Sequence, residues 1–213
     1  MPSLETLLNT CSVLHQHLCP RQVLGVRMGL LGGRLLGIDV PQTDKRLLTF
    51  VELDGCGADG VAVATGCRVG RRTLRILDYG KTAATFVDTY TGRAFRVRPN
   101  PAARDCAQDY APEAKTRWEG YLLGYQRMPE DELLLAQEVA LNWSLEKLLS
   151  KHGYRVTCEQ CGEEIINERE VVVNGRLLCQ TCGVATYFRP VDDFVTEALQ
   201  MVYATPYSLA YET

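Results

Sequence analysis

Four cysteines near the C-terminal end carry the strongest chemical signal in the sequence. Cys158/Cys161 and Cys179/Cys182 form two C-x-x-C pairs separated by 17 residues. A tetrahedral zinc ion takes four thiolate ligands at about 2.3 Å, and each tight C-x-x-C turn supplies two of them. Iron is the alternative metal, because it also accepts tetrahedral sulfur. Since a closed four-thiolate site has no open position for a substrate, we expect a structural zinc that folds this module.

A second group of metal-binding side chains lies near the N-terminus, where His15, His17 and Cys19 alternate with other residues. In an extended backbone these three side chains project to the same side and could face one metal ion. In a helix they diverge by about 200° per step, so that only part of the set could bind one ion. A metal or catalytic site and a loop with a buried cysteine beside an incidental histidine pair both remain open.

Two further cysteines extend this group. Cys56 stands between a predicted strand and a predicted helix, where functional loops sit and where the helix dipole makes a thiol more acidic. Cys67 follows the same helix. Each thiol, taken alone, is more typical of a buried core residue. Taken together, the candidate ligands of a core metal are His15, His17, Cys19, Cys56 and Cys67.

The segment from Cys67 to Arg104 is basic within an acidic chain, with nine Lys or Arg residues against two Asp. The plainer interpretation is the solvent-exposed face of a sheet. The alternative is a pocket for a ligand that carries a carboxylate or phosphate, next to the core metal. The candidate residues of that pocket are Asp59, Arg68, Arg71 and Lys81.

The elements that must position these side chains follow from periodicity and turn residues. Helices are predicted over 3–14, 20–31, 57–65 and 130–150, the last being the clearest, and Gly32-Gly33 is predicted to end the second. Strands are predicted over 47–53, 73–79, 83–90 and 93–97, with turns at Tyr79-Gly80-Lys81 and Thr91-Gly92. A hairpin with an Asn174-Gly175 turn is predicted between the two C-x-x-C pairs. This order of elements predicts an α+β fold.

Length and composition set the outer limits. The chain has 213 residues, a net charge of −3 and 46% hydrophobic residues, as expected for a soluble globular protein and not for a globally basic nucleic-acid binder. No apolar run approaches the roughly 18 residues of a membrane-spanning helix, and the N-terminus lacks the pattern of a signal peptide. We therefore expect a cytoplasmic protein with reduced thiols. Its predicted parts are a core with a linker helix (1–153), a zinc-finger-like module (154–190) and a tail helix (191–213).

The order of several motifs resembles the FmdE family of formylmethanofuran dehydrogenase proteins. These motifs are H-x-H-x-C-P at 15–20, C-x-x-D at 56–59, T-G-C at 65–67, D-Y-G-K at 78–81 and the terminal C-x-x-C pairs. The resemblance implies an α-β-α-β-β-β core with a mixed sheet, followed by helices and a small four-cysteine zinc-binding module. It also implies a homodimer and an accessory role beside a molybdenum or tungsten oxidoreductase.

Carried over by motif, the resemblance implies a composite metal site in which His15, His17 and Cys19 are joined by the later cysteines. Three positions depart from the family pattern. Gln16 and Arg21 stand where the family commonly has glycine, and Arg71 stands where it has lysine. The two bulkier residues are expected to narrow access to the site, and Arg71 keeps the charge but cannot act as a low-pKa amine.

Three functional hypotheses follow. The leading one is a metal-binding accessory protein with a structural zinc in the tail and a second metal, expected to be zinc, in the core. The alternative is a zinc-dependent hydrolase or deaminase-type enzyme, in which Asp59, Glu52 or Asp54 serves as the base for a metal-activated water. A third is an adaptor whose zinc module docks a partner protein.

Overall fold

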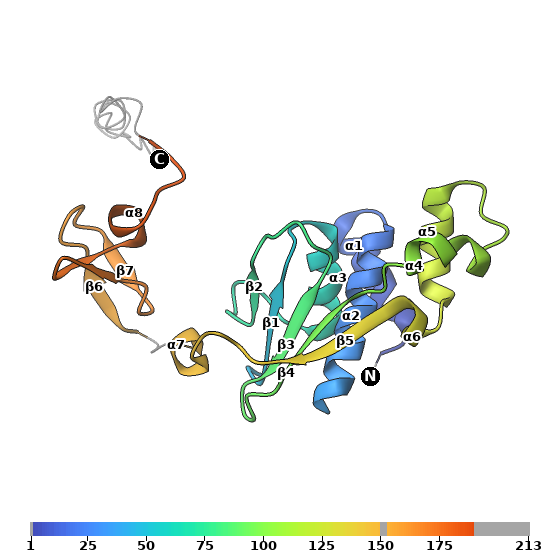
Figure 1. The fold of residues 1–213 in the computed structure, drawn as a ribbon, viewed down its shortest axis with the longest axis horizontal. Helices are drawn as coiled ribbons and strands as arrows, with labels where there is room; N and C mark the ends of the chain where they lie inside the picture. The colour runs from blue at the N-terminus through green and yellow to red at the C-terminus, as the bar shows by residue number, and fades with distance from the viewer. Residues whose placement is uncertain (1, 150–152, 190–213) are drawn as a thin grey trace, which may run out of the picture. The chain divides into compact units, whose positions relative to one another are not determined.

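The structure is a computed structural model that describes residues 2–149 and 153–189. The chain divides into two compact units, Met1–Leu145 and Glu146–Thr213 (Figure 1). We call them the core unit and the tail unit and treat each by itself. The predicted tail helix, 191–213, lies outside the described residues. Within the described residues, no helix is long and apolar enough to cross a membrane.

The core unit is a mixed five-stranded sheet with helices packed on it. Its helices are α1 (Leu4–His15), α2 (Pro20–Leu36), α3 (Cys56–Thr65), α4 (Ala103–Cys106), the 3-10 helix η1 (Ala107–Tyr110), α5 (Arg117–Arg127) and α6 (Glu130–Leu133). Its strands are β1 (Leu47–Val51), β2 (Leu74–Ile76), β3 (Ala84–Asp88), β4 (Ala94–Pro99) and β5 (Leu134–Val139). They are ordered β2-β1-β3-β4-β5, with β1 parallel to β2 and the other neighbours antiparallel. The predicted α+β class with a mixed sheet is confirmed.

Helix α2 continues through Gly32 and Gly33, where the sequence predicted its end. A Cβ on Gly32 would lie 2.3 Å from the ring of Phe86, and a Cβ on Gly33 would lie 2.8 Å from Val40. The two glycines therefore make room for buried side chains of the sheet and of the following loop. The helix ends at Gly37, which has a φ of 65° and donates its N–H to the carbonyl of Arg34.

The prediction of one long helix over 130–150 is wrong. Only one turn, α6, forms at its start, and Leu134–Val139 becomes β5. The reason is tertiary: β5 pairs antiparallel with β4 over six positions, from Pro99↔Leu134 to Ala94↔Val139. These ladder bonds cover an edge that β4 would otherwise leave open, and they outweigh a local helix preference that is worth only tenths of a kcal/mol per residue.

Of the two predicted turns in the sheet, one forms a hairpin. Thr91-Gly92 joins β3 to β4, which are neighbours, and Gly92 has a φ of 75°. The turn at Tyr79-Gly80-Lys81 joins β2 to β3 without pairing them, because both strands pair with β1. The chain therefore passes from one side of β1 to the other at this point.

The tail unit consists of two small two-stranded sheets. β6 (Arg155–Thr157) pairs with β7 (Glu164–Ile166), and β8 (Val171–Val173) pairs with β9 (Arg176–Leu178). The predicted Asn174-Gly175 turn joins β8 to β9, with φ angles of 51° and 77°. Short helices flank the sheets, α7 (Leu145–Leu149) at the boundary with the core unit and α8 (Gln180–Gly183) after β9. Among the described residues the buried core of this unit is only Cys158, Ile165 and Leu178.

Candidate functional site

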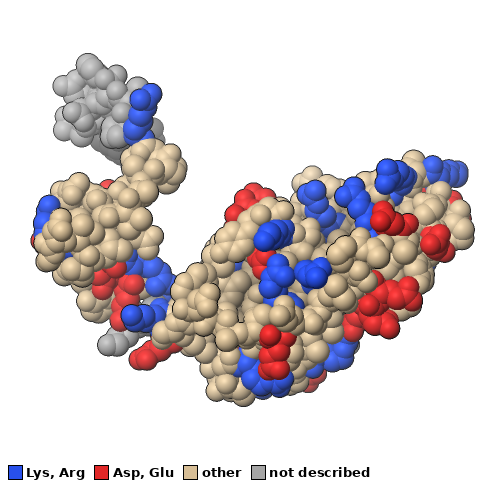
Figure 2. Space-filling view, viewed as in Figure 1, with Lys and Arg blue, Asp and Glu red and all other residues tan. Residues whose placement is uncertain are grey.

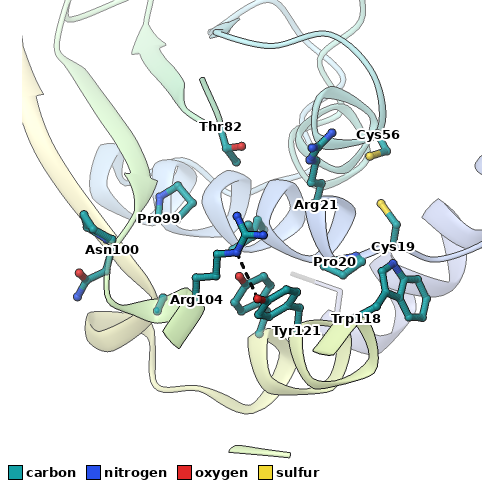
Figure 3. Close-up of a pocket in the computed structure, with 14 residues that line it drawn as sticks. Cys19, Pro20, Arg21, Cys56, Thr82, Pro99, Asn100, Arg104, Trp118 and Tyr121 are labelled. Atoms are coloured by element: carbon teal, nitrogen blue, oxygen red, sulfur yellow. Dashed lines mark hydrogen bonds between the residues drawn. The ribbon is translucent and has the colours of Figure 1, made fainter. Parts of the chain in front are cut away.

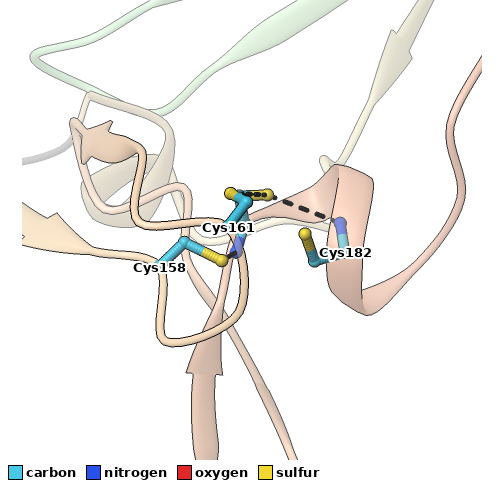
Figure 4. Close-up of side chains that lie close together, drawn as sticks. Cys158, Cys161 and Cys182 are labelled. Carbon is cyan, nitrogen blue, oxygen red and sulfur yellow. Dashed lines mark hydrogen bonds between the residues drawn. The ribbon is translucent and has the colours of Figure 1, made fainter. Parts of the chain in front are cut away.

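The four tail cysteines converge as the sequence predicted. Their sulfur atoms all lie within 4.8 Å of one another, and the sulfurs of Cys161 and Cys179 are 3.8 Å apart. A tetrahedron with metal–sulfur bonds of about 2.3 Å has edges of about 3.8 Å, so the spacing fits one tetrahedral ion. In the close-up of Figure 4 the side chains come from the β6–β7 turn and from α8 and its N-terminus. These residues can hold one metal ion.

Backbone N–H groups in the tail site donate hydrogen bonds to cysteine sulfur atoms and so favour negative charge there. The N–H of Cys179 donates to the sulfur of Cys158 at 3.3 Å, and the N–H of Cys182 donates to the sulfur of Cys179 at 3.4 Å. Backbone hydrogen bonds from Cys161 and, second, from Cys179 lower the pKa of Cys158 to about 6. The neighbouring thiols have the opposite effect on Cys182, where the hydrogen bond with Cys179 raises the pKa to about 12. The site therefore favours a thiolate at Cys158 without a metal, and a bound cation would stabilise a thiolate at Cys182 as well.

In the core unit, Cys19 and Cys56 meet because two helices cross at glycines. Cys19 is the N-cap of α2, and Cys56 is the first residue of α3. A Cβ on Gly25 would lie 2.3 Å from the carbonyl oxygen of Gly57. A Cβ on Gly60 would lie 2.4 Å from the carbonyl oxygen of the α2 residue Gln22. Backbone therefore contacts backbone near the starts of both helices, and this contact brings their N-terminal residues together.

The two thiols line one end of a cavity (Figure 3). Burial is the largest cause that raises the pKa of Cys56, to about 11, and its hydrogen bond with Cys19 adds to it, while Arg21 opposes the shift. Beside them Gln22 is fully buried; its Oε1 accepts the N–H of Cys19 at 2.8 Å, and its Nε2 has no hydrogen-bond partner. The Cys56 thiol is thus held at the start of α3, in surroundings that favour its protonated form in the absence of a cation.

The histidines form a second pair in the α1–α2 connection. His15 is the last residue of α1, and its Nδ1 lies 3.0 Å from the carboxylate of Asp59 on α3. The rings of His15 and His17 have centroids 4.7 Å apart. Between them Gln16 adopts a φ of 64°, which ends the helix and turns the chain. The motif is thus neither extended nor helical, and His15 and His17 meet through a left-handed turn.

Cys11 is a neighbour of this group that the sequence analysis missed. It is fully buried on α1, and burial, Asp59 and Cys19 together raise its pKa to about 11. The available signal was helical spacing, because Cys11 and His15 are four residues apart and lie on one face of α1.

Other predicted site residues are not brought together. Cys67 follows α3, about 15 Å along the ten-residue helix from Cys56, and is buried with its sulfur 3.4 Å from the carbonyl oxygen of Leu47. Asp59 contacts His15, but neither it nor Arg68, Arg71 or Lys81 lines the cavity. The basic residues that do line it are Arg21 and Arg104.

The cavity has a volume of about 710 Å³, and α5 forms one of its walls. Trp118, Tyr121 and Tyr125 of this helix line it. Helix α5 is tied to α2 by Arg27, which donates to the carbonyl oxygens of Tyr125 at 2.9 Å and Met128 at 2.6 Å. Sequence analysis missed this wall; the spacing of the three aromatic residues, which places them on one face of a helix, was the available signal.

The donors of the core are thus arranged as pairs. Across residues 2–149 and 153–189, the tail cysteines are the only group of three or more Cys, His, Asp or Glu whose ligand atoms lie within 4.8 Å of one another. The thiol pair and the histidine pair are of the right chemical kind for a soft metal. A third ligand would have to reach the two sulfurs by rotation of a side chain.

The fold and these sites define a class of protein: an α+β core that gathers thiols and imidazoles beside a cavity, followed by a four-cysteine module. The family model described as "FmdE, Molybdenum formylmethanofuran dehydrogenase operon" matches residues 14–148. This match spans more than half of the chain, so the chain belongs to the FmdE family. It contains the thiol pair, the histidine pair and the cavity residues, whereas Cys11 and the tail cysteines lie outside it.

Two individual proteins are similar to the chain. A protein of Archaeoglobus fulgidus named as a probable S-adenosyl-L-methionine-binding protein is 32% identical over 206 residues, covering 86% of this chain and 54% of that protein. The chain thus spans about half the length of that relative. The crystal structure of a tungsten formylmethanofuran dehydrogenase FmdE-like protein from Syntrophus aciditrophicus matches with a TM-score of 0.58 and 22% identity, covering 88% of this chain and 96% of that one. At this identity, the match shows a shared fold.

Proposed function

We propose that the chain is a metal-binding accessory protein with two centres, a structural zinc in the tail module and a second soft metal ion at the core cavity. The observation that carries the proposal is the meeting of Cys19 and Cys56 at the N-termini of two helices, with the pair of His15 and His17 close by. Membership in the FmdE family supports the accessory role.

The core residues suggest which atoms would bind the metal ion. Cys19 and Cys56 would supply two sulfur ligands, and a histidine would supply a nitrogen. Because Asp59 engages Nδ1 of His15, the other ring nitrogen is the one left for a metal. A carboxylate behind a ligating imidazole fixes the ring and increases its basicity. Three protein ligands of this kind leave one position of a tetrahedral ion for a small molecule.

Metal content per chain, measured by elemental mass spectrometry, tests the proposal. We expect two ions in the parent chain and one in Cys19→Ser/Cys56→Ser. The matched control is Cys67→Ser, a buried thiol away from the pair, which should keep two. The tail variant Cys161→Ser should keep only the core ion. A single ion in the parent chain that is unaffected by Cys19→Ser/Cys56→Ser would refute the core centre while leaving the tail site intact.

The rival enzyme hypothesis needs a carboxylate base near the metal. Glu52 is 8% exposed, and its two oxygens accept hydrogen bonds from Arg96 at 2.6 and 2.7 Å. Asp59 is engaged by His15. In this arrangement two of the three candidate bases already have partners, which favours the accessory role over the zinc-dependent hydrolase or deaminase.

The partner is proposed from the family alone. The family description refers to a formylmethanofuran dehydrogenase operon, so we propose an oxidoreductase of that kind, with molybdenum or tungsten, as the protein served. The homodimer stays a prediction, to be tested by light scattering of the full chain. The ligand named for the Archaeoglobus relative is not assigned to this chain, because the chain corresponds to about half of that protein.

A further inference from the structure

We infer that the core cavity binds a small molecule with a flat conjugated ring and an acidic group. This inference goes beyond the proposed metal centre, because it depends on the arginines and the α5 wall of the cavity and not on the thiols. At about 710 Å³ the cavity lies within the range of about 300–1,000 Å³ that is usual for small-molecule sites. It is therefore large enough for a ring system with substituents.

The charge of the lining selects an anion. Arg21 and Arg104 are its only charged residues among those the structure describes, and the lining contains no Asp or Glu. Neither arginine forms an ion pair in the described part of the chain; Arg104 donates only to the neutral hydroxyl of Tyr121, at 3.3 Å. In Figure 3 both guanidinium groups project into the same space. Guanidinium groups without a carboxylate partner are well suited to bind a carboxylate or phosphate by paired hydrogen bonds.

The surroundings reinforce this positive field. Figure 2 shows several Lys and Arg side chains along the upper part of the core in that view, with some Asp and Glu side chains among them. A further arginine, Arg117, lies over the Tyr121 ring at 6.0 Å without lining the cavity. Together with Arg104, it lowers the pKa of the Tyr121 hydroxyl. The arginines beside Tyr121 therefore favour an organic anion over an organic cation at this wall.

The shape and chemistry of the α5 wall select a planar ring. The rings of Tyr121 and Tyr125 stack with centroids 5.8 Å apart and planes at 11°. Trp118 is 52% exposed although it lines the cavity, so a large part of its indole is available for contact. Conjugated rings stack on such aromatic faces and on guanidinium planes. An aliphatic acid would meet the arginines but leave the exposed part of the Trp118 indole uncovered.

The probes are 2-naphthoate and adenosine 5′-monophosphate, two flat anions of different origin, titrated calorimetrically into the full chain. We expect at least one to bind with a Kd of about 1 mM or lower, a modest affinity for a ligand of this size. Two control ligands test the negative charge and the flat ring separately. 2-Naphthylmethylammonium keeps the ring and reverses the charge, and cyclohexanecarboxylate keeps the charge and removes the flat ring. Both should bind at least about tenfold more weakly.

Variants locate the binding. Arg104→Gln should weaken binding of the anion by at least about tenfold, because a charge-assisted contact is lost. The matched control is Arg117→Gln, which removes an arginine from the same tyrosine but not from the lining, and should change the Kd by less than about threefold. Trp118→Phe should abolish the quenching of tryptophan fluorescence by the ligand, whereas Trp143→Phe should keep it.

Three results would overturn the inference: no binding of either anion at millimolar concentration, equal binding of the cationic probe, or equal effects of Arg104→Gln and Arg117→Gln. Metal content is measured in the same samples. A chain that binds the anions and carries a single metal ion, which Cys19→Ser/Cys56→Ser leaves in place, supports this inference and refutes the core metal centre. A chain that carries two metal ions and binds neither anion refutes this inference and supports the core metal centre.

Discussion

The contact between α2 and α3 can be tested at one atom. In Gly60→Ala the added Cβ would lie 2.4 Å from the carbonyl oxygen of Gln22 and 3.0 Å from the amide nitrogen of Val26. Since an unstrained contact of this kind needs about 3.3 Å, the two helices would have to separate by nearly 1 Å. The neighbouring atoms belong to backbone, so no side-chain rotation can relieve the overlap.

The expected loss of stability follows from two opposing terms. Forcing an extra carbon into a packed core costs about 1–3 kcal/mol, and contact with backbone points to the upper end of that range. Alanine in place of glycine in a helix returns about 1 kcal/mol. We therefore expect Gly60→Ala to lower the free energy of unfolding of the core unit by about 2 kcal/mol.

Urea unfolding followed by tryptophan fluorescence measures this change. Both tryptophans, Trp118 and Trp143, lie in the core unit, so their signal reports that unit alone. The control is Gly70→Ala, where no atom lies within 4 Å of the added Cβ and φ is not left-handed. It should be neutral or stabilising by up to about 1 kcal/mol. If Gly60→Ala were as stable as the parent chain, the close contact at this glycine would not determine how α2 and α3 cross.

Three further outcomes are expected. Asp88→Asn should lower the free energy of unfolding by about 2 kcal/mol, because the 2% exposed carboxylate accepts hydrogen bonds from Arg46 at 2.9 and 3.2 Å. Since Arg46 lowers the pKa of Asp88, this stabilisation is present above the unfolded-state pKa of about 3.9 and is lost as pH falls through the lower folded-state pKa. The urea midpoints of parent and variant should therefore converge in acid. Gln16→Gly should raise the free energy of unfolding, measured in urea, by about 0.5–1 kcal/mol, because glycine adopts the left-handed φ of 64° without the strain that a side chain causes. An unchanged free energy of unfolding would contradict this. Chelation of zinc should unfold the tail unit, which has three buried core residues among those described, and leave the core unit folded. An amide NMR spectrum that keeps its dispersed tail signals would count against a structural metal.

Local signals in the sequence predicted much of the fold. Ser3 caps α1 by accepting the N–H of Thr6 at 3.2 Å, as its place before an apolar stripe indicated. The strands of the sheet before residue 100 correspond to the four predicted runs, and the Asn174-Gly175 hairpin forms. The convergence of the tail cysteines was predictable for the same reason, because two tight turns on a short hairpin leave few other arrangements.

Features that depend on distant partners could not be predicted in this way. The helical pattern of 130–150 was real, but β4 offered Leu134–Val139 a ladder that no local signal revealed. Within the basic stretch the prediction chose Arg68, Arg71 and Lys81, whereas the cavity takes Arg104, the last residue of that stretch, and Arg21 from the start of α2. Charge counted along the chain does not indicate which side chains share a space, because that depends on how α5 packs on α2.

The core site also depends on distant partners that the sequence does not reveal, and the glycines have a different role in the structure than their sequence context indicates. In a sequence, Gly25, Gly57 and Gly60 indicate weak helices, since each lowers helix propensity. In the structure they allow two helices to touch backbone to backbone, and that contact places Cys19 beside Cys56. The metal-binding hypothesis began from the spacing of residues 15 to 19, yet the thiol pair depends on a crossing formed outside that motif. The residues that determine whether the site forms are therefore glycines with no chemistry of their own, which is why Gly60→Ala tests the architecture of the site more directly than removal of a ligand.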